Sequence, residues 1–127
     1  MAKKFSYHGH GIEELKAMPL DKFSAIIPSK IRRTLRRMSY RIKAFIEKLR
    51  KTDSKKTIRT HLREMPVIPE MVDRKFQVYN GKEWVIVVAT PAMLGKRLGE
   101  YSITTKLVKH SGPGIGATRG SKSVELK

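Results

Sequence analysis

The sequence contains no cysteine. This excludes disulfides, thiolate zinc sites and cysteine nucleophiles. No apolar run approaches the roughly 20 residues of a membrane-spanning helix, and the first residues lack the apolar stretch of a secretory signal. We therefore expect a cytoplasmic protein that does not enter a membrane.

Acidic residues are also scarce. The 127 residues include 11 aspartates and glutamates against 28 lysines and arginines, which gives a formal net charge of +17. Self-repulsion of this size opposes a compact isolated state unless a polyanion neutralises it. Nucleic acid is the predicted partner, and a basic protein lying on an anionic membrane surface is a weaker alternative.

Three regions differ in composition. Residues 1–56 form a basic, helical N-terminal extension, residues 57–110 form an α/β core, and residues 111–127 form a flexible, basic, glycine-rich tail. The stretch 51–56 holds no apolar residue and marks the boundary. In the first region we expect a short helix that starts near Glu13 and stops before Pro19, and a second segment at 20–27.

Apolar residues then recur at helical spacing in two stretches, which predicts two amphipathic helices separated near Ser39. Glu47 is the one acid among their many cations. Arginine forks bind phosphates bidentately, although a solvated surface is the ordinary alternative for a charge run. We expect RNA contacts from the cations of this stripe, of which the strongest candidates are Arg32, Arg33, Arg36, Arg37, Arg41 and Lys43.

The second region has the patterns of a small sheet. Alternation around Phe76 and an apolar run at 84–89 flank Asn80-Gly81, a dipeptide favoured in tight hairpin turns. Thr90-Pro91 predicts a single helical turn ended by Gly95, and a further strand is expected at 102–108. Phe76, Tyr79 and Trp84 could stack on bases, but packing in the hairpin is favoured.

No motif indicates catalysis, a metal or a cofactor. The G-x-G-x-x-A spacing at 112–117 lacks the strand and helix of a dinucleotide-binding turn, and His8-x-His10 has no neighbouring carboxylate cluster. The dispersed glutamates fit structural ion pairs. We expect no enzymatic activity and no small-molecule substrate, and a tail whose Arg119 and Lys122 run between RNA segments.

Several segments resemble the family of small-subunit ribosomal protein S19, of the archaeal and eukaryotic type. They are Thr60-His61-Leu62-Arg63-Glu64-Met65-Pro66-Val67-Ile68-Pro69-Glu70-Met71-Val72, Phe76-Gln77-Val78-Tyr79-Asn80-Gly81-Lys82, Met93-Leu94-Gly95, Leu98-Gly99-Glu100-Tyr101-Ser102 and Pro113-Gly114-Ile115-Gly116-Ala117-Thr118-Arg119. Their order and spacing match over about the C-terminal half of the chain. The basic helical region is similar to the extension of archaeal and eukaryotic members.

The resemblance implies an α+β domain with a three-stranded sheet and a short helix, bound to ribosomal RNA in the head of the small subunit. It also implies ribosomal protein S13 as a neighbour and a tail directed toward the decoding region, near transfer RNA. A DNA-binding architectural protein is the alternative that charge alone permits. The RNA contacts that the resemblance implies are His61, Arg63, Asn80, Lys82, Lys96, Arg97, Thr104, Lys106, Lys109, His110 and Arg119.

The sequence departs from this family pattern at a few positions. Asp73 stands where glycine is usual, Lys96 where histidine is usual, Ser111-Gly112 where glycine-arginine is usual, and Ser123 where an aromatic is usual. Aspartate tolerates a positive φ less readily than glycine does. We therefore expect Asp73 to alter the turn before the hairpin.

Overall fold

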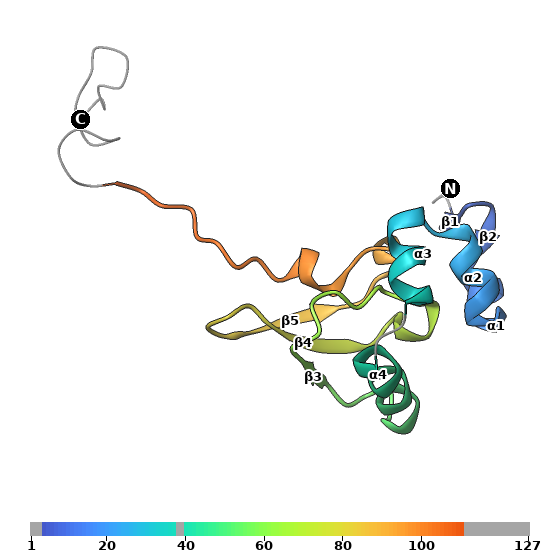
Figure 1. Cartoon of the computed structure of the whole chain (residues 1–127), viewed down its shortest axis with the longest axis horizontal. Helices are drawn as coiled ribbons and strands as arrows, with labels where there is room; N and C mark the ends of the chain where they lie inside the picture. The colour runs from blue at the N-terminus through green and yellow to red at the C-terminus, as the bar shows by residue number, and fades with distance from the viewer. Residues whose placement is uncertain (1–3, 38–39, 111–127) are drawn as a thin grey trace, which may run out of the picture.

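The structure, a computed structural model, describes residues 4–37 and 40–110. After a small N-terminal hairpin, four α-helices precede a three-stranded sheet (Figure 1). The helices are α1 (Ile12–Ala17), α2 (Leu20–Ile26), α3 (Ser29–Arg36) and α4 (Tyr40–Lys51). All four lie where the sequence patterns predict helices. The pattern of α3 continues to Met38, which falls outside the described residues.

The sheet consists of β3 (Ile58–Thr60), β4 (Lys75–Tyr79) and β5 (Trp84–Val88) in the order β3-β4-β5. Strand β4 pairs with β5 antiparallel and with β3 parallel. The α+β fold with a three-stranded sheet is thus confirmed, but the third strand was expected in the wrong place. Residues 103–110 form no strand, because β-branched residues alone cannot make one without an adjacent sheet edge.

In the β4–β5 hairpin, the two central residues of the turn lie one position later than the predicted pair Asn80-Gly81. Asn80 N–H donates to the carbonyl of Glu83 at 3.1 Å, so Gly81 and Lys82 occupy the centre of the turn. Gly81 has a φ of 101°, which suits glycine. The Asn80 side-chain Oδ1 accepts from the amides of Lys82 at 2.9 Å and Glu83 at 2.8 Å, and this closes the turn.

A second, small hairpin that the patterns did not predict opens the described chain. It joins β1 (Ser6–Tyr7) to β2 (His10–Gly11), with Tyr7 opposite His10. The two turn residues, His8 and Gly9, both have positive φ values, 48° and 86°. Such a turn matches the twist of its strands. The Tyr7 ring then packs 6.4 Å from that of Phe23, between ring centroids.

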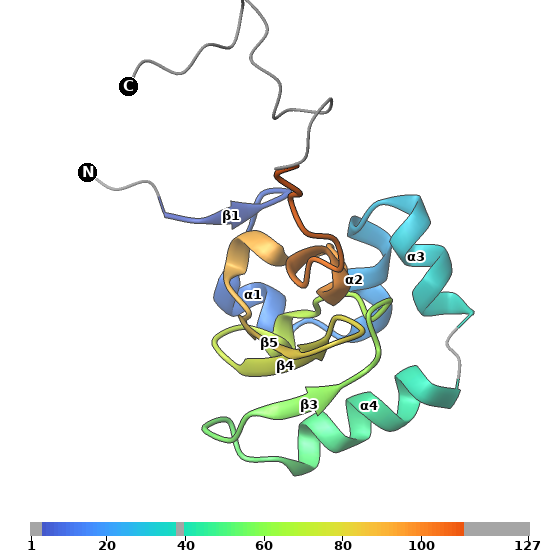
Figure 2. The ribbon, with the colours of Figure 1, turned by 90° about the vertical axis from the view of Figure 1, so that its left-hand side faces the viewer.

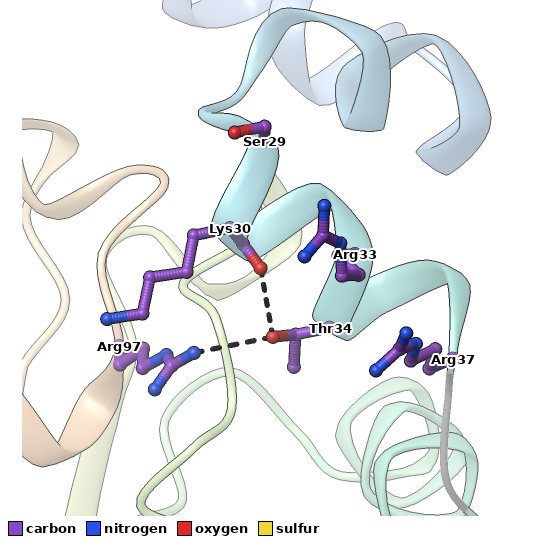
Figure 3. Close-up of a pocket in the computed structure, with 6 residues that line it drawn as sticks. All are labelled: Ser29, Lys30, Arg33, Thr34, Arg37 and Arg97. Carbon is purple, nitrogen blue, oxygen red and sulfur yellow. Dashed lines mark hydrogen bonds between the residues drawn. The ribbon is translucent and has the colours of Figure 1, made fainter.

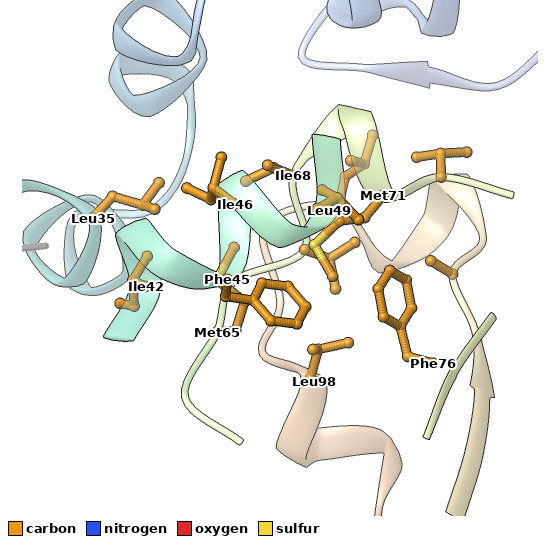
Figure 4. Packing of buried hydrophobic residues seen from close by; sticks show 14 of the residues in the cluster. Leu35, Ile42, Phe45, Ile46, Leu49, Met65, Ile68, Met71, Phe76 and Leu98 are labelled. Carbon is orange, nitrogen blue, oxygen red and sulfur yellow. The ribbon is translucent and has the colours of Figure 1, made fainter. Parts of the chain in front are cut away.

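One buried cluster joins the helices to the sheet. The apolar face of α4 lies against the sheet, with the ring of Phe45 6.2 Å from that of Phe76 (Figure 4). Figure 2 shows α4 running beside β3 and α3 above the end of α4. Leu15, Phe23 and Leu35 from the preceding helices belong to the same cluster. Buried residues on both sides of the stretch 51–56 therefore pack together.

Three 3-10 turns complete the described fold. They are η1 (Pro69–Met71), η2 (Pro91–Met93) and η3 (Leu98–Tyr101). The turn expected after Thr90-Pro91 is confirmed as η2, although the Thr90 side chain makes no capping hydrogen bond. Gly95 follows with a φ of 73°. A methyl group added there would come within 2.6 Å of the Tyr7 hydroxyl, so the glycine lets the N-terminal hairpin approach.

Candidate nucleic-acid interface

Neighbouring arginines of α3 have opposite roles. Arg32 points back to the C-terminal end of α2, where its Nε donates to the Ser24 carbonyl at 2.9 Å and its Nη2 to those of Ala25 and Ile27. The last carbonyls of a helix lack partners within it, and a cation there is favourable. Arg33 is exposed. Arg32 therefore holds α2 and α3 together, whereas the guanidinium of Arg33 is open to a ligand.

Two further arginines also bind backbone carbonyls. Arg63 donates through Nη1 to Tyr79 at 2.8 Å and through Nη2 to Gly99 at 2.9 Å and to Ser102. Arg74 donates to the carbonyls of Leu49 and Thr52 at the end of α4. Arg63 thereby joins the hairpin to η3 and to the start of the extended segment. The family motif that contains Arg63 thus carries an interaction within the fold.

A cationic cleft lies between α3 and the residue that precedes η3. It has a volume of about 310 Å³, and Figure 3 shows its lining side chains around Thr34. Arg97 Nη2 lies 3.4 Å from Thr34 Oγ1, and Thr34 Oγ1 donates to the Lys30 carbonyl at 3.2 Å. The lining residues, which include no acid, are Ser29, Lys30, Arg33, Thr34, Arg37 and Arg97. We call this the α3 cleft.

The fold brings Arg97 to this cleft from a distant part of the sequence. The backbone of Arg97 pairs with Pro66, and its amide N–H donates to Glu100 Oε1 at 3.3 Å. The Arg97 Nε is buried and has no acceptor among the described residues. The residue patterns predicted Arg33, Arg37 and Arg97 as RNA contacts and included Lys30 in the cationic stripe, but they did not predict Ser29 or Thr34. The i, i+4 spacing of Thr34 from Lys30 was the available signal for Thr34.

A groove between α4 and β3 combines aromatic and cationic side chains. Its volume is about 440 Å³, and its lining residues are Tyr40, Arg41, Ala44, Phe45, Lys48, Arg59, Thr60, His61 and Leu62. We call this the α4–β3 groove. The Tyr40 residue is 86% exposed at its rim. The groove thus offers both flat rings and positive charge to a ligand.

Aromatic packing supports the floor of this groove. The His61 ring lies 4.9 Å from the ring of Tyr79 and 4.8 Å from that of Trp84, between centroids, and the Arg59 guanidinium lies 5.7 Å from the Trp84 ring. Phe76 is in the buried core, as predicted. Tyr79 and Trp84 are only partly buried and pack on each other across the hairpin.

The other predicted contacts are spread over the surface. Arg36, Lys43, Lys82 and Lys96 are exposed and line neither the α3 cleft nor the α4–β3 groove. Asn80 is half-buried, and its Oδ1 closes the hairpin turn. An extended segment away from the sheet carries Thr104, Lys106, Lys109 and His110, all of them exposed (Figure 1). Arg119, Lys122 and the glycine spacing at 112–117 lie outside the described residues.

Ion pairs within residues 4–37 and 40–110 are few and lie away from the α3 cleft. Arg50 Nη2 lies 2.9 Å from Glu70 Oε1, and this hydrogen bond, together with the carboxylate charge, raises the pKa of Arg50. Lys16 pairs with Asp73 at 3.2 Å. Lys30, Arg33 and Arg37 make no ion pair in that part of the chain. The positive charge of the cleft is therefore not neutralised from within the fold.

The described residues form neither a metal site nor a membrane-spanning helix. Within the described ranges, no group of three or more histidine, aspartate and glutamate side chains is placed to hold a metal ion. His10 contacts Glu14 at 3.4 Å, and no third such residue joins them. None of the helices seen there has the length and apolar character needed to cross a bilayer.

Comparison with known proteins gives a consistent result. The family model described as "Ribosomal protein S19" matches residues 31–110. The small ribosomal subunit protein uS19 of Saccharolobus solfataricus is 45% identical over 130 residues, which cover 98% of this chain and 93% of the relative. The protein of the same name from Picrophilus torridus is 42% identical over 127 residues, covering 99% and 83%. A third, from Metallosphaera sedula, is 45% identical over 130 residues.

Proposed function

Since the chain belongs to the ribosomal protein S19 family, we propose that its cationic surfaces bind the ribosomal RNA of the small subunit. The protein is a structural constituent of that subunit and not an enzyme, and as part of the ribosome it works in the cytoplasm. The family resemblance of the motif residues is thereby confirmed. Nothing in the comparisons favours the DNA-binding alternative.

The observation that carries RNA binding is the exposed positive charge of α3 and of the start of α4. Arg33, Arg36 and Arg37 project from α3 in a stretch with no acidic residue, and Arg41 and Lys43 follow on α4. Surfaces built for solubility mix both signs of charge. A surface of one sign suits a polyanion, whose condensed counterions are released when lysine and arginine replace them.

We assign different roles to the arginines selected from the sequence. Arg32 and Arg63 donate to carbonyls of the protein itself, so they support RNA binding by holding elements in place. The remaining cations have side chains directed to solvent or into the two hollows. These are the proposed direct contacts, together with Arg119 and Lys122.

A position in the subunit head, with ribosomal protein S13 as a neighbour, belongs to the same proposal, as does a tail that extends toward transfer RNA at the decoding region. An apolar surface supports a protein neighbour. Ile103 is 71%, Leu107 98% and Val108 67% exposed on the extended segment. Three large apolar side chains exposed within six residues are a surface that a partner would cover.

Sedimentation of a lysate from the native host tests the ribosomal role. At low magnesium, which separates the subunits, the protein should stay with the small subunit, and its release to the top of the gradient would contradict the proposal. A second test replaces Arg33, Arg36 and Arg37 together with alanine. The slope of log affinity against log salt for ribosomal RNA should flatten by about 0.7 to 0.9 per lost phosphate contact.

A further inference from the structure

We propose that the α3 cleft is a binding site for the phosphodiester backbone of an RNA strand, and that the bound strand fastens α3 to the core through Arg97. This inference rests on the proposed function and specifies one site of it. It gives a ligand to Ser29 and Thr34, which no sequence motif selects, and it makes the site a contact between two parts of the fold.

The chemistry of the lining selects phosphate over base. Four of the six lining residues are cations, two are hydroxyl residues, and none is aromatic or aliphatic. Aromatic rings are the usual surfaces on which bases stack, and no aromatic residue lines the α3 cleft. Divalent metal ions need carboxylates or other oxygen ligands, and no acid lines the cleft. Charged forks and hydroxyl donors suit phosphate oxygens.

The spacing of the cations favours a strand over a single ion. Lys30 and Arg33 lie on α3, and Arg37 is the residue that caps its C-terminal end, so these cations at positions i, i+3 and i+7 span about 10 Å along the helix axis. A free phosphate could contact only part of such a row. A chain of linked phosphates can contact more of it, from Lys30 and Arg97 on one side of Thr34 to Arg33 and Arg37 on the other (Figure 3).

The Arg97 guanidinium has unused donors at this wall. Its Nε is buried without an acceptor among the described residues, and its Nη2 has only the long contact of 3.4 Å with Thr34 Oγ1. An unpaired buried donor is costly, and a charged acceptor restores more free energy than a neutral one. A small rotation of the fork toward the cleft would give both nitrogens a phosphate acceptor.

A phosphate held this way would link distant segments. Thr34 and Arg97 are separated by 63 positions in the sequence, and their side chains meet only at this contact. In the absence of an anion, the four cations of the cleft repel one another. The phosphates of a bound strand would attract these cations from both sides of the cleft. The position of α3 against the core should therefore become better defined when RNA binds.

The experiment follows the Nε–H signal of Arg97 by nuclear magnetic resonance in the isotopically labelled full-length chain, assigned by its absence in Arg97→Lys. The probes are a short oligouridylate, an abasic ribose-phosphate chain of the same length, a methylphosphonate oligouridylate and inorganic phosphate. The first two should shift the signal with similar affinity, because the site contacts no base. The uncharged methylphosphonate should leave it unmoved, and inorganic phosphate should bind much more weakly.

Arg33→Gln and Lys22→Gln form a pair of variants that each remove one positive charge. Both residues are exposed, but only Arg33 lines the cleft, and Lys22 is not among the proposed RNA contacts. Arg33→Gln should weaken the oligouridylate titration of the Arg97 signal roughly fivefold to tenfold, and Lys22→Gln should leave it unchanged. Equal effects of the two variants would overturn the inference, since they would indicate diffuse charge attraction.

Two more outcomes separate this site from the general function. If filter binding shows RNA bound while the Arg97 signal stays still, the α3 cleft is not the site and the proposed function stands. If the signal responds but the protein is absent from small subunits in the sedimentation test, the proposed function fails while the cleft remains a phosphate site. Saturation by inorganic phosphate at the same phosphate concentration as the oligouridylate would contradict a strand ligand.

Discussion

Asp73 Oδ2 accepts a hydrogen bond from Lys16 Nζ at 3.2 Å, while the Asp73 backbone has a φ of 69°. Lys16 belongs to α1, and Asp73 stands just before β4, where its amide donates to the Ala89 carbonyl at 2.8 Å. Among non-glycine residues, aspartate and asparagine tolerate positive φ best. Asp73 thus adopts a positive φ in this turn, and its side chain contacts the N-terminal helices.

The Asp73 turn gives a ranked prediction. Asp73→Ala should lower the free energy of unfolding by about 1 kcal/mol, because alanine has neither the freedom of glycine nor the local hydrogen bonding of aspartate at this φ. Asp73→Gly should differ from the parent by less than about 0.5 kcal/mol, and Lys16→Ala likewise, since the pair is exposed. Urea unfolding measures all three, and a larger loss for glycine than for alanine would contradict the backbone argument.

We expect the hydrogen bonds of Arg63, and not only its positive charge, to stabilise the fold. Arg63→Lys keeps the charge but cannot donate to three separated carbonyls. We expect a loss of about 2 kcal/mol in the free energy of unfolding, measured by urea denaturation. Arg36→Lys, on an exposed helical surface, is the matched control and should change it by less than about 0.5 kcal/mol. Similar small losses for both variants would show that the carbonyl contacts of Arg63 contribute little.

Gly95 and Tyr7 should be coupled. Gly95→Ala places a methyl group within 2.6 Å of the Tyr7 hydroxyl at a φ of 73°. We expect a loss of about 2 to 3 kcal/mol from backbone strain and overpacking together. Tyr7→Phe removes the hydroxyl, so the double variant should recover part of this loss and leave about 1 kcal/mol of backbone strain. Strictly additive losses in a double-mutant cycle of thermal unfolding would mean that the hairpin moves aside freely.

The α4–β3 groove should bind RNA partly by stacking. Tyr40→Ala should weaken RNA binding by about 1 to 3 kcal/mol without changing the salt slope, because a stacked ring releases no counterion. Arg41→Gln should instead reduce the slope by about 0.7 to 0.9. Trp84 is the single tryptophan of the chain, and its fluorescence reports on this groove during both titrations. An unchanged affinity for Tyr40→Ala at every salt concentration would remove the stacking contribution.

Local sequence was sufficient for the parts of the fold that depend on short-range periodicity. The apolar spacing around Ile31 and Leu35, and from Ile42 to Leu49, is enough to predict α3 and α4, because a helix must bury one stripe of its surface. Asn80-Gly81 predicts the hairpin for a similar local reason. The unequal charge predicts a polyanionic ligand, since charge is a property of composition and not of fold.

Tertiary structure decided which segment forms the third strand of the sheet. It also decided which arginines bind carbonyls of the protein and which face solvent or a cleft. Ile58–Thr60 becomes a strand because β4 offers it a free edge, whereas the β-branched residues after Ser102 have no such neighbour. Arg32 and Arg33 are equivalent in sequence, but a helix turns about 100° per residue, so one fork meets the carbonyls of α2 and the other faces the cleft. Composition predicts that this protein binds a polyanion. The packing of distant segments, which joins Thr34 to Arg97, forms the cleft in which we propose that an RNA strand binds.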